Sequence, residues 1–333
     1  MKVTVHDVAK TAKTSTATVS RVVSGGANVS QTTKETVLRA IEECGYVPRQ
    51  KSKCTKQTNK DVVLVIVEDL ELVAYLDYIK GMTNVLVAGG KAVFVYSSNY
   101  DPQKEVYCLQ LADQNKFCGV IMLSAIENPT LLKALEEVKI PVVFANRYLR
   151  SIETDTVAMD NYKLGYMATN ELIRKGHKKI AHLAGSRTSN ASLDRVRGYK
   201  DAMEAAKLST PQNAIFYGDI KYEGGTAFAD WLLKEKMPFT AVFASNESMS
   251  LGLIETLEDH NVSCPDCISV ICAIQTNMVR VGKIKLTGFG YGSIEMGEKA
   301  AILLLQRLKE PNGKKMHIAF TPELMENNSI KKI

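Results

Sequence analysis

The stretch T-V-H-D-V-A-K-T-A-K-T-S-T-A-T-V-S-R-V-V, residues 4–23, has the apolar spacing of two short helices joined by a tight turn. The turn is predicted at residues 13–15. Thr4, with Asp7 three positions on, resembles the capping box that starts a helix. Each predicted helix has one apolar face, formed by Val5, Val8, Ala9 and Ala12 in the first and by Val19, Val22 and Val23 in the second.

Two helices of this length bury too little apolar surface to be stable alone, so a third is required. Residues 32–44, which end at Gly45, have the pattern of that helix, with Val37, Leu38 and Ile41 on its apolar face. The first 48 residues are therefore predicted to form a three-helix bundle that contains a helix-turn-helix, a motif that binds DNA.

The composition is that of an ordinary soluble protein. The chain has 333 residues, enough for two or three domains, and 45% of them are hydrophobic and 23% charged. No apolar run approaches the roughly 20 residues that span a membrane. The apolar core of a signal peptide is also missing from the start of the sequence, so a cytoplasmic protein is expected.

The basic charge is concentrated at one end of the chain. Residues 1–60 hold eleven Lys and Arg against four Asp and Glu, whereas the remaining residues hold 31 basic and 32 acidic side chains. This distribution is typical of a segment that meets nucleic-acid phosphates, although a merely solvated basic end would show it too.

The seven cysteines are too scattered, and odd in number, for a disulfide framework. Cys264 and Cys267 form one C-x-x-C, with His260 before it and Cys272 after it, so a zinc or redox site is conceivable. No second C-x-x-C completes a structural tetrad. Ordinary thiols, with no metal and no cofactor, are the preferred interpretation.

A polar, basic segment over residues 49–61, R-Q-K-S-K-C-T-K-Q-T-N-K-D, is predicted to be a linker. From residue 62 onward, short β-branched runs alternate with helical patterns of 10–15 residues, and this alternation restarts near residue 161. The pattern predicts an α/β fold with parallel sheets covered by helices on both faces, arranged as two similar lobes within residues 62–333. The N-lobe is expected at about 62–160 plus about 290–318. The C-lobe is expected at about 161–288 plus the C-terminal tail.

Ligands of such folds bind at the carboxyl ends of the strands, and a cleft between two lobes is the natural pocket. Polar residues follow the predicted strands at these ends, including Asp69, Ser97, Asn146, Arg147, Asp160 and Asn246.

The whole chain resembles the LacI/GalR (lactose-repressor/galactose-repressor) family of bacterial transcription regulators. The motifs that carry the resemblance are V-H-D-V-A-K, T-A-T-V-S-R-V-V-S-G and E-C-G-Y-V-P, then V-A-M-D-N-Y at 157–162, L-I-R-K-G-H at 172–177 and F-A-S-N-E-S-M at 243–249. Among members of the family, the sequence is most similar in appearance to catabolite-control and sugar-operon regulators of Gram-positive bacteria. The fold implied for residues 62–333 is a two-lobed core like that of periplasmic binding proteins.

The resemblance implies a homodimer that reads a pseudo-palindromic operator in the major groove of double-stranded DNA. Thr16, Ala17 and Arg21 match the family positions that meet bases. Arg21 can donate two hydrogen bonds to guanine, and Ala17 offers an apolar contact to a thymine methyl group. Ser15 or Thr16 can also cap the second helix. Further DNA contacts are expected from Thr4, Ser15, Ser20, Asn28, Ser30, Tyr46, Lys51, Lys53 and Thr55.

The linker departs from the family pattern. Family members insert a leucine of a short hinge helix into the minor groove and kink the DNA. Here the matching residue is Thr55. Two outcomes are open: the linker binds through charge alone, which makes affinity strongly salt-dependent, or Cys54 is a weak substitute for the wedge.

The effector cleft departs from the pattern as well. Arg195, in R-V-R-G-Y, matches the arginine that clamps a small ligand in many relatives, and its planar group suits sugar hydroxyls or a carboxylate. The family's ligand-binding aspartate is replaced by Ile274, and Leu72 and Ala74 replace a polar and aromatic pair. A family-style effector site is therefore expected from Asp69, Ser97, Asn146, Arg147, Asp160, Arg195, Asn246 and Gln275, but for a ligand that need not be an ordinary sugar.

Other functions fit the sequence less well. Neither a nucleophile motif nor a phosphate loop of the G-x-x-x-x-G-K type is present, so an enzyme is not expected. A periplasmic sugar-binding module would lack the helix-turn-helix. Within regulation, control by a small carbohydrate-derived effector is favoured, with control by a non-sugar metabolite or a protein corepressor left open. A tetramerising heptad tail is not expected.

Overall fold

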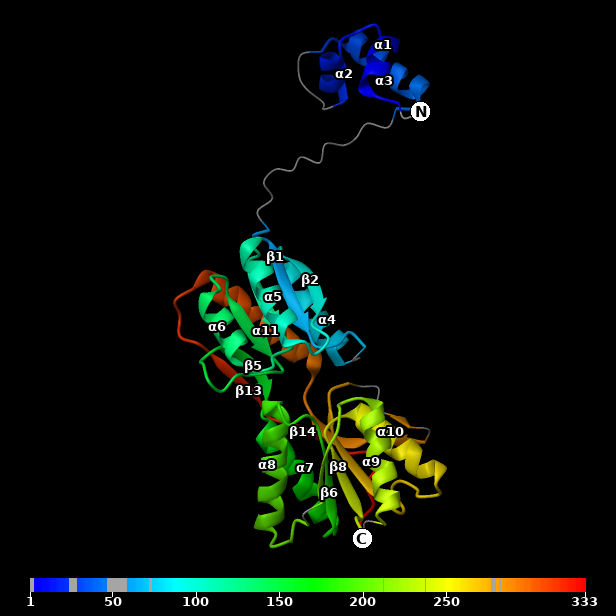
Figure 1. The fold of residues 1–333 in the computed structure, drawn as a ribbon, viewed down its shortest axis with the longest axis vertical. Helices are drawn as coiled ribbons and strands as arrows, with labels where there is room; N and C mark the ends of the chain where they lie inside the picture. Colours follow the sequence, from blue (N-terminus) through cyan, green and yellow to red (C-terminus); the bar gives the residue numbers. More distant parts are fainter. Residues whose placement is uncertain are drawn as a thin grey trace. The chain divides into compact units, whose positions relative to one another are not determined.

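The computed structural model describes residues 3–23, 29–46, 59–71, 74–211, 213–236, 238–276, 280–281 and 283–333. The chain forms two compact units, residues 1–57 and 58–333, drawn in Figure 1. Among the described residues, no helix is both long and apolar enough to cross a membrane.

The first unit is the predicted three-helix bundle. Its helices are α1 (Val5–Thr11), α2 (Thr16–Val23) and α3 (Gln31–Cys44), and all three contact one another. The core consists of small and β-branched side chains: Val8, Ala9, Ala12, Val19, Val22, Val37 and Ala40. The apolar periodicity therefore predicted the bundle and most of its core correctly.

Two residues assigned to the apolar faces are in fact exposed. Val23 is 38% exposed and Leu38 is 47% exposed. Ala40 takes the buried position on α3 instead, together with Val37. The bundle is so small that three helices in contact leave room for only a narrow apolar stripe on each.

Short polar caps fix the ends of these helices. The Asp7 carboxylate accepts hydrogen bonds from the Thr4 backbone N–H (2.8 Å) and hydroxyl (2.7 Å). Ser15 accepts from the Thr18 N–H (3.1 Å), and Ser30 accepts from the Thr33 N–H (3.2 Å). These bonds satisfy N–H groups that a helix leaves open at its first turn.

The N-lobe of the second unit is a six-stranded parallel sheet in the order β13-β5-β4-β3-β1-β2. Alternate residues of the central strand point to opposite faces: Val63, Val65 and Val67 pack against α4 and α11, whereas Leu64 and Ile66 pack against α5 and α6. The elements are β1 (Val62–Val67), α4 (Ala74–Ala88), β2 (Ala92–Ser97), α5 (Pro102–Gln114), β3 (Gly119–Met122), α6 (Pro129–Glu137), β4 (Val142–Ala145), β5 (Asp155–Met159), α11 (Ser293–Lys309) and β13 (His317–Phe320).

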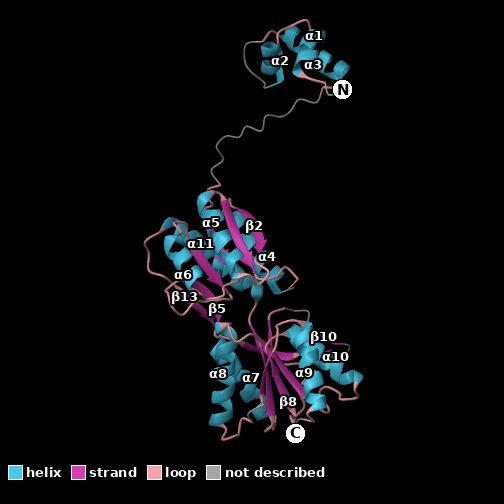
Figure 2. Ribbon diagram, viewed as in Figure 1, coloured by secondary structure: helices cyan, strands magenta, loops and turns pink. Residues whose placement is uncertain are grey.

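The C-lobe repeats this plan with strand order β14-β12-β9-β8-β6-β7, in which only the edge strand β14 is antiparallel. Figure 2 shows α7 and α8 on one side of these strands and α9 and α10 on the other. The elements are α7 (Asn161–Arg174), β6 (Ile180–Ala184), α8 (Asn190–Ala205), β7 (Ile215–Tyr217), α9 (Tyr222–Lys234), β8 (Ala241–Ala244), α10 (Glu247–Asp259), β9 (Ser269–Ile274), β12 (Thr287–Gly290) and β14 (Glu323–Met325), with a hairpin of β10 (Arg280–Val281) and β11 (Ile284–Lys285).

The chain crosses between the lobes three times, after β5, after β12 and after β13. The crossings touch one another: the Asp160 N–H donates to the Phe320 carbonyl (3.0 Å), and the Tyr291 and Phe320 rings lie 4.3 Å apart. Three adjacent segments between two rigid sheets form a hinge about which the lobes can close.

A buried ion pair fixes the return of the chain to the N-lobe. Asp155, which is fully buried, accepts from the Arg307 guanidinium at 2.7 and 2.8 Å, and also from the Met316 N–H at 3.0 Å. Arg307 in turn donates to carbonyls of the loop after α11. Burial acts to raise the pKa of Asp155, but the hydrogen bonds from Arg307 and Met316 hold it below its ordinary value.

We expect Asp155→Asn to destabilise the second unit by about 3–5 kcal/mol at neutral pH, because the buried Arg307 would lose its counter-charge. The loss should shrink as pH falls through the lowered pKa of Asp155, since the wild-type carboxylate is then protonated as well. Urea unfolding of the full chain at several pH values measures it. The exposed pair of Asp266 and Lys331 provides a matched control, and Asp266→Asn should cost at most about 1 kcal/mol. Equal effects of the two substitutions would contradict the role given to Asp155.

Candidate functional site

The helix-turn-helix presents one side of α2 away from the bundle core. Ala17, Ser20 and Arg21 are exposed and Thr16 is half-buried, whereas Val19 and Val22 on the opposite side are buried. A guanidinium, two hydroxyls and a methyl group on one helix face are the groups that read base edges in a major groove.

Three of the predicted phosphate contacts also hold the helices in place. Thr4, Ser15 and Ser30 each engage a helix start through their side chains, and Tyr46 packs half-buried against the bundle core. Helix starts also attract phosphate oxygens, so capping and phosphate contact are compatible for these residues. The remaining predicted contacts, Asn28, Lys51, Lys53 and Thr55, lie outside the described residues, as does Cys54.

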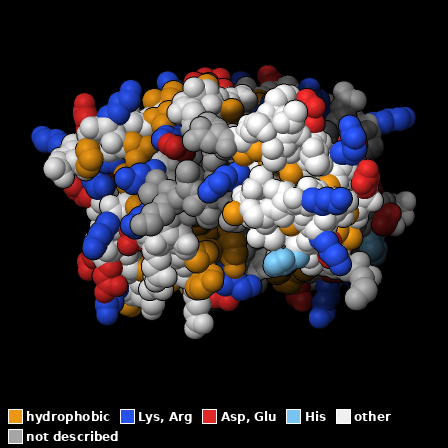
Figure 3. Space-filling model, turned by 90° about the horizontal axis from the view of Figure 1, so that it is seen from above, with side chains coloured by type: hydrophobic (Ala, Val, Ile, Leu, Met, Phe, Trp, Pro, Cys, Tyr) orange, Lys and Arg blue, Asp and Glu red, His pale blue; other side chains and the backbone are white. Residues whose placement is uncertain are grey.

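The described bundle itself is nearly balanced in charge. Its five exposed cations, Lys10, Lys13, Arg21, Lys34 and Arg39, stand against four exposed carboxylates, none of which is on α2. Figure 3 shows both Lys and Arg and Asp and Glu side chains on the visible surface. The basic excess found in the sequence therefore belongs mainly to residues 49–60, where five further cations are clustered.

The second candidate site is a cavity of about 620 Å³ between the lobes of the second unit. Its walls combine charged groups with aromatic and aliphatic side chains from both sheets, which is typical of a small-molecule pocket. Among the residues that line it are Glu68, Tyr75, Tyr100, Ile126, Asn146, Arg147, Ser192, Arg195, Ile220, Lys221, Ser245, Asn246, Glu247, Leu251 and Gln275.

The N-lobe wall is built around a buried ion pair. Arg147 donates from Nε to Glu68 Oε1 (3.0 Å) and from Nη2 to Glu68 Oε2 (2.7 Å), and the Tyr75 hydroxyl donates to Glu68 Oε2 (2.8 Å). Burial and the Glu68 charge raise the pKa of Tyr75 well above its ordinary value, which keeps its hydroxyl proton in place. Both carboxylate oxygens of Glu68 are thus occupied by neighbours within the protein.

The C-lobe wall is organised by Arg195, which extends from the second turn of α8. Its Nε donates to Asn161 Oδ1 (2.9 Å) and its Nη1 donates to the Ser245 carbonyl. Asn246 caps α10 by accepting from the Met249 N–H (2.8 Å) and donates to the Ile220 carbonyl (2.6 Å). These contacts align the carboxyl ends of the C-lobe strands along one side of the cavity.

The structure brings five of the eight predicted effector residues to the cavity: Asn146, Arg147, Arg195, Asn246 and Gln275. Asp69, Ser97 and Asp160 do not line it. Asp69 pairs across the lobes with Lys221 (3.2 Å), Ser97 donates to the Glu68 carbonyl (3.2 Å), and Asp160 caps α7 at the hinge. A strand end carries several polar residues, and the sequence does not show which of them turns inward.

Most lining residues were absent from the predicted effector set, among them Glu68, Tyr100, Ser192 and Glu247. Glu68 directly follows the apolar run of β1 and Glu247 directly follows Asn246, so both stand at strand ends that the pattern marks. Tyr100 and Ser192 carry no such signal, because a loop was expected around them. The sequence pattern predicts this helix over residues 194–206. In the structure α8 begins at Asn190, four residues earlier, which places Ser192 in its first turn.

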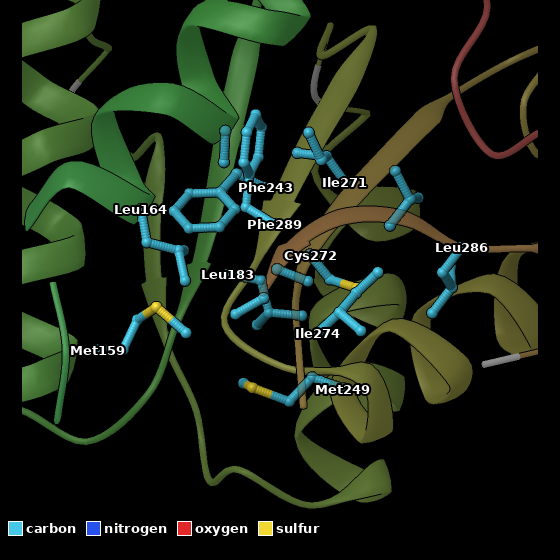
Figure 4. Close-up of a cluster of buried hydrophobic side chains, with 14 of the residues drawn as sticks. Met159, Leu164, Leu183, Phe243, Met249, Ile271, Cys272, Ile274, Leu286 and Phe289 are labelled. Carbon is cyan, nitrogen blue, oxygen red and sulfur yellow. The ribbon is translucent and has the colours of Figure 1, made fainter. Parts of the chain in front are cut away.

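Ile274, which stands where relatives have a ligand-binding aspartate, belongs to the core. It is 3% exposed and packs among Cys272, Leu286 and Met249 in the cluster shown in Figure 4. Its side chain also lies over Gly288. An apolar residue in this place adds to the C-lobe core and contributes no polar group to the cavity.

Two glycines let α7 and α8 approach closely enough to place Arg195. A Cβ on Gly165 would lie 2.2 Å from the Arg195 carbonyl oxygen, and a Cβ on Gly198 would lie 2.2 Å from that of Tyr162. Both contacts are with backbone, which cannot rotate away. Only glycine fits at these two crossing points.

Gly165→Ala should therefore destabilise the second unit by about 1–3 kcal/mol, the range found for overpacked interiors. Gly292 is the matched control, since the nearest atom to an added Cβ there is 4.0 Å away. Gly292→Ala should cost only about 0.5 kcal/mol, because alanine is a poorer residue than glycine at the N-cap of α11. Thermal or urea unfolding of the full chain compares the two. Equal stability of Gly165→Ala and the wild type would show that the helices can separate without cost.

The C-x-x-C segment has the properties of ordinary thiols. Cys264 is buried, and burial raises the pKa of its thiol to about 12, whereas Cys267 is exposed. Within the described ranges, no group of three or more His, Cys, Asp or Glu side chains is arranged to hold a metal ion.

Both parts of the chain match models of known protein families. Residues 4–49 match bacterial regulatory proteins of the lacI family, and residues 60–287 match periplasmic binding proteins and the sugar binding domain of the LacI family. The chain is therefore a member of the LacI family, a DNA-binding transcriptional regulator with an effector-binding core.

Individual relatives are similar over almost their whole length. The HTH-type transcriptional repressor PurR of Vibrio atlanticus (strain LGP32) is 27% identical over 98% of both chains. Catabolite control protein A of Priestia megaterium is 28% identical over 93% of this chain and 94% of its own. The structure of the transcriptional regulator CelR in complex with cellobiose has 27% identity and a TM-score of 0.73, covering 98% of this chain and 100% of that one. The resemblance inferred from the sequence motifs, including that to catabolite-control regulators, is confirmed.

Proposed function

We propose that this protein is a cytoplasmic repressor that binds a pseudo-palindromic operator as a dimer and is controlled by a small molecule in the interlobe cleft. The observation that carries the proposal is that one chain has both an exposed face on α2 without acidic residues and a cavity between two hinged lobes, lined by apolar and charged side chains. A ligand that closes the lobes changes the geometry at which two bundles are presented to DNA, and this couples the two sites.

Base reading is assigned to Thr16, Ala17 and Arg21, with Ser20 and the helix-capping hydroxyls contacting phosphates. In the linker, Thr55 replaces the leucine wedge, so we propose that residues 49–60 add affinity through charge. This predicts a steep fall of DNA affinity with salt.

Arg21→Ala should weaken binding to the preferred sequence by roughly tenfold to a hundredfold, because a guanidinium bonded to guanine contributes about 1–3 kcal/mol. The duplex is first selected from a random pool with the wild-type protein, and affinity is then measured by fluorescence anisotropy. Arg39→Ala on the exposed surface of α3 provides the matched control. Unchanged sequence preference in Arg21→Ala would remove Arg21 from the reading face.

A carbohydrate-derived effector is favoured by the family and by the cellobiose complex of CelR, which is similar to this chain over 98% of its length. The cavity here adds its own chemistry, with Ile126, Ile220 and Leu251 providing apolar walls between the charged groups. A non-sugar metabolite fits these walls as well. A purely periplasmic-type binding role is disfavoured, because the two-lobed unit follows a helix-turn-helix unit in the same chain.

The sequence predicts dimerisation through both lobes, and on the N-lobe we propose that it involves the free edge of the sheet. The strand β2 lies at this edge (Figure 1), and Phe94 on it is 57% exposed. Large exposed apolar side chains surround the edge on the flanking helices: Leu76 and Val87 on α4, and Tyr107 and Leu111 on α5. A second copy covers such a patch and the open strand edge at the same time.

Sedimentation should show a dimer at micromolar concentration, and Phe94→Glu should weaken self-association by roughly tenfold or more, about 1.4 kcal/mol. Met316→Glu is the control, because Met316 is 46% exposed beside β13, at the opposite edge of the same sheet. A wild-type monomer, or equal effects of the two substitutions, would contradict this interface.

A further inference from the structure

The lobes touch on two flanks of the cavity, and the contacts on the two flanks differ in kind. On the α8 flank, the first half of α8 meets the N-lobe loop that follows β4. On the Lys221 flank, the loop before α9 meets the N-lobe loop that follows β1. The relative strength of the two contacts determines which flank separates when the lobes open.

A buried carboxylate on α8 joins the lobes on the α8 flank. Asp194 is 9% exposed, and it accepts from Arg150 Nη2 at 2.6 Å and from the Tyr148 hydroxyl. Burial and the hydrogen bond to Asp194 raise the pKa of Tyr148, so its hydroxyl stays protonated and donates. Arg197, one turn further along α8, lies 3.2 Å from the same carboxylate. Asp194 therefore has donors from both lobes, and hydrogen bonds to a charged group are about twice as strong as neutral ones.

A second set of hydrogen bonds lies one turn earlier on α8. Asn190 Nδ2 donates to Glu127 Oε2 (3.0 Å) and to the Tyr148 carbonyl (3.2 Å). The Glu127 carboxylate also accepts from the backbone N–H groups of Arg150 and Ser151, both at 3.0 Å, which holds the N-lobe loop where it meets α8. Two positions on one face of the helix thus join α8 to the N-lobe.

The Lys221 flank is joined by one partly exposed cation. Lys221 Nζ lies 3.2 Å from Asp69 Oδ2 and 3.8 Å from Glu71 Oε2, and the Lys221 side chain is 40% exposed. The ammonium also lies 5.9 Å from the centre of the Tyr100 ring. Exposed ion pairs add little to stability, because water hydrates both charges when they separate. This flank can therefore open at low cost.

The places of the two flanks in the sheets add to this difference. The chain crosses between the lobes at the ends of β5, β12 and β13. Asp69 follows β1, which lies three strands away from β5, and Lys221 follows β7, the edge strand farthest from β12. The loop of the α8 flank instead follows β4, the neighbour of β5, and α8 packs on α7, which begins at a crossing. The α8 flank is thus close to the hinge and the Lys221 flank is far from it.

We infer that the contacts of Asn190 and Asp194 with the N-lobe form a pivot, which keeps the α8 flank joined in the ligand-free protein while the lobes separate at the Lys221 flank. Rotation about a pivot on one flank moves the strand ends of the other flank most, so the cavity is exposed between Lys221 and Asp69. The inference rests on the proposed function only in that this opening admits a small molecule.

Two distances between spin labels test the pivot, measured by double electron–electron resonance on the full chain without DNA or ligand. The labels are attached to an encoded keto amino acid, so that the native cysteines stay unlabelled. One pair of labels, at Leu70 and Glu223, spans the Lys221 flank, and the other, at Glu153 and Lys200, spans the α8 flank; all four side chains are exposed. We expect a broad or two-peaked distance distribution across the Lys221 flank and a single narrow one across the α8 flank.

Substitutions on each flank show which contacts are responsible. Asp194→Ala should broaden the distribution across the α8 flank. Arg150 and Arg197 are both about half exposed, so water hydrates them when the carboxylate is removed and the fold is kept. Lys221→Ala should increase the open population across the Lys221 flank by roughly two- to fivefold, as expected for loss of an exposed ion pair, and leave the α8 flank unchanged.

Tyr148→Phe is a milder variant that removes only one hydroxyl of the pivot, and it should broaden the α8-flank distribution less than Asp194→Ala does. Glu171 provides the matched control, because it is a buried carboxylate that pairs with Arg174 (2.7 Å) three residues further along α7, within the C-lobe. Glu171→Ala should change neither distribution.

Equal opening across both flanks of the wild type would overturn the pivot. So would an α8-flank distribution that stays narrow in both Asp194→Ala and Tyr148→Phe, or a single narrow distance across the Lys221 flank in both the wild type and Lys221→Ala. Neither DNA nor a ligand is present in these measurements, so their failure would leave the proposed effector and operator binding standing. The DNA-reading part is judged separately by Arg21→Ala.

Discussion

The close crossing of α7 and α8 is the constraint on which the C-lobe site depends. Gly165 and Gly198 allow the two backbones to touch, and this contact sets the height at which α8 passes the ends of the C-lobe strands. Arg195 then reaches Asn161 on one helix and Ser245 at the end of a strand. A shift of α8 by the width of one methyl group would break the contacts of Arg195 with Asn161 and Ser245, because tightly packed interiors transmit such shifts.

The two lobes contribute different chemistry to the cavity. The charges of the N-lobe wall are neutralised internally, because Glu68 accepts hydrogen bonds from both Arg147 and Tyr75. The C-lobe wall instead carries the Arg195 guanidinium and the Glu247 carboxylate without an ion pair between them. Each wall has one buried hydroxyl, of Tyr100 and of Ser192, that makes no hydrogen bond to a described residue.

The sequence predicted the parts whose signal is local. Periodicity located the bundle, and alternating runs located the sheets, because each apolar stripe has a fixed spacing. Periodicity could not predict that Leu38 and Val23 are exposed, because their exposure depends on how wide an apolar stripe each helix buries when the three helices pack together. Ile274 was recognised as a departure from the family motif, but its burial in the C-lobe core depends on Gly288, which is distant in sequence. Ser192 was missed because the helix was predicted to start at residue 194, four residues later than α8 begins.

The three adjacent crossings have a consequence for how the family can diversify. Residues 161–290 leave the N-lobe and return to it at neighbouring points, so the main body of the C-lobe is one uninterrupted, portable segment. Recombination at the hinge could exchange this segment between relatives and leave the helix-turn-helix bundle unchanged. The exchanged segment would carry the C-lobe wall of the cavity from one regulator and place it opposite the N-lobe wall of another. A new ligand specificity could then arise from two existing regulators.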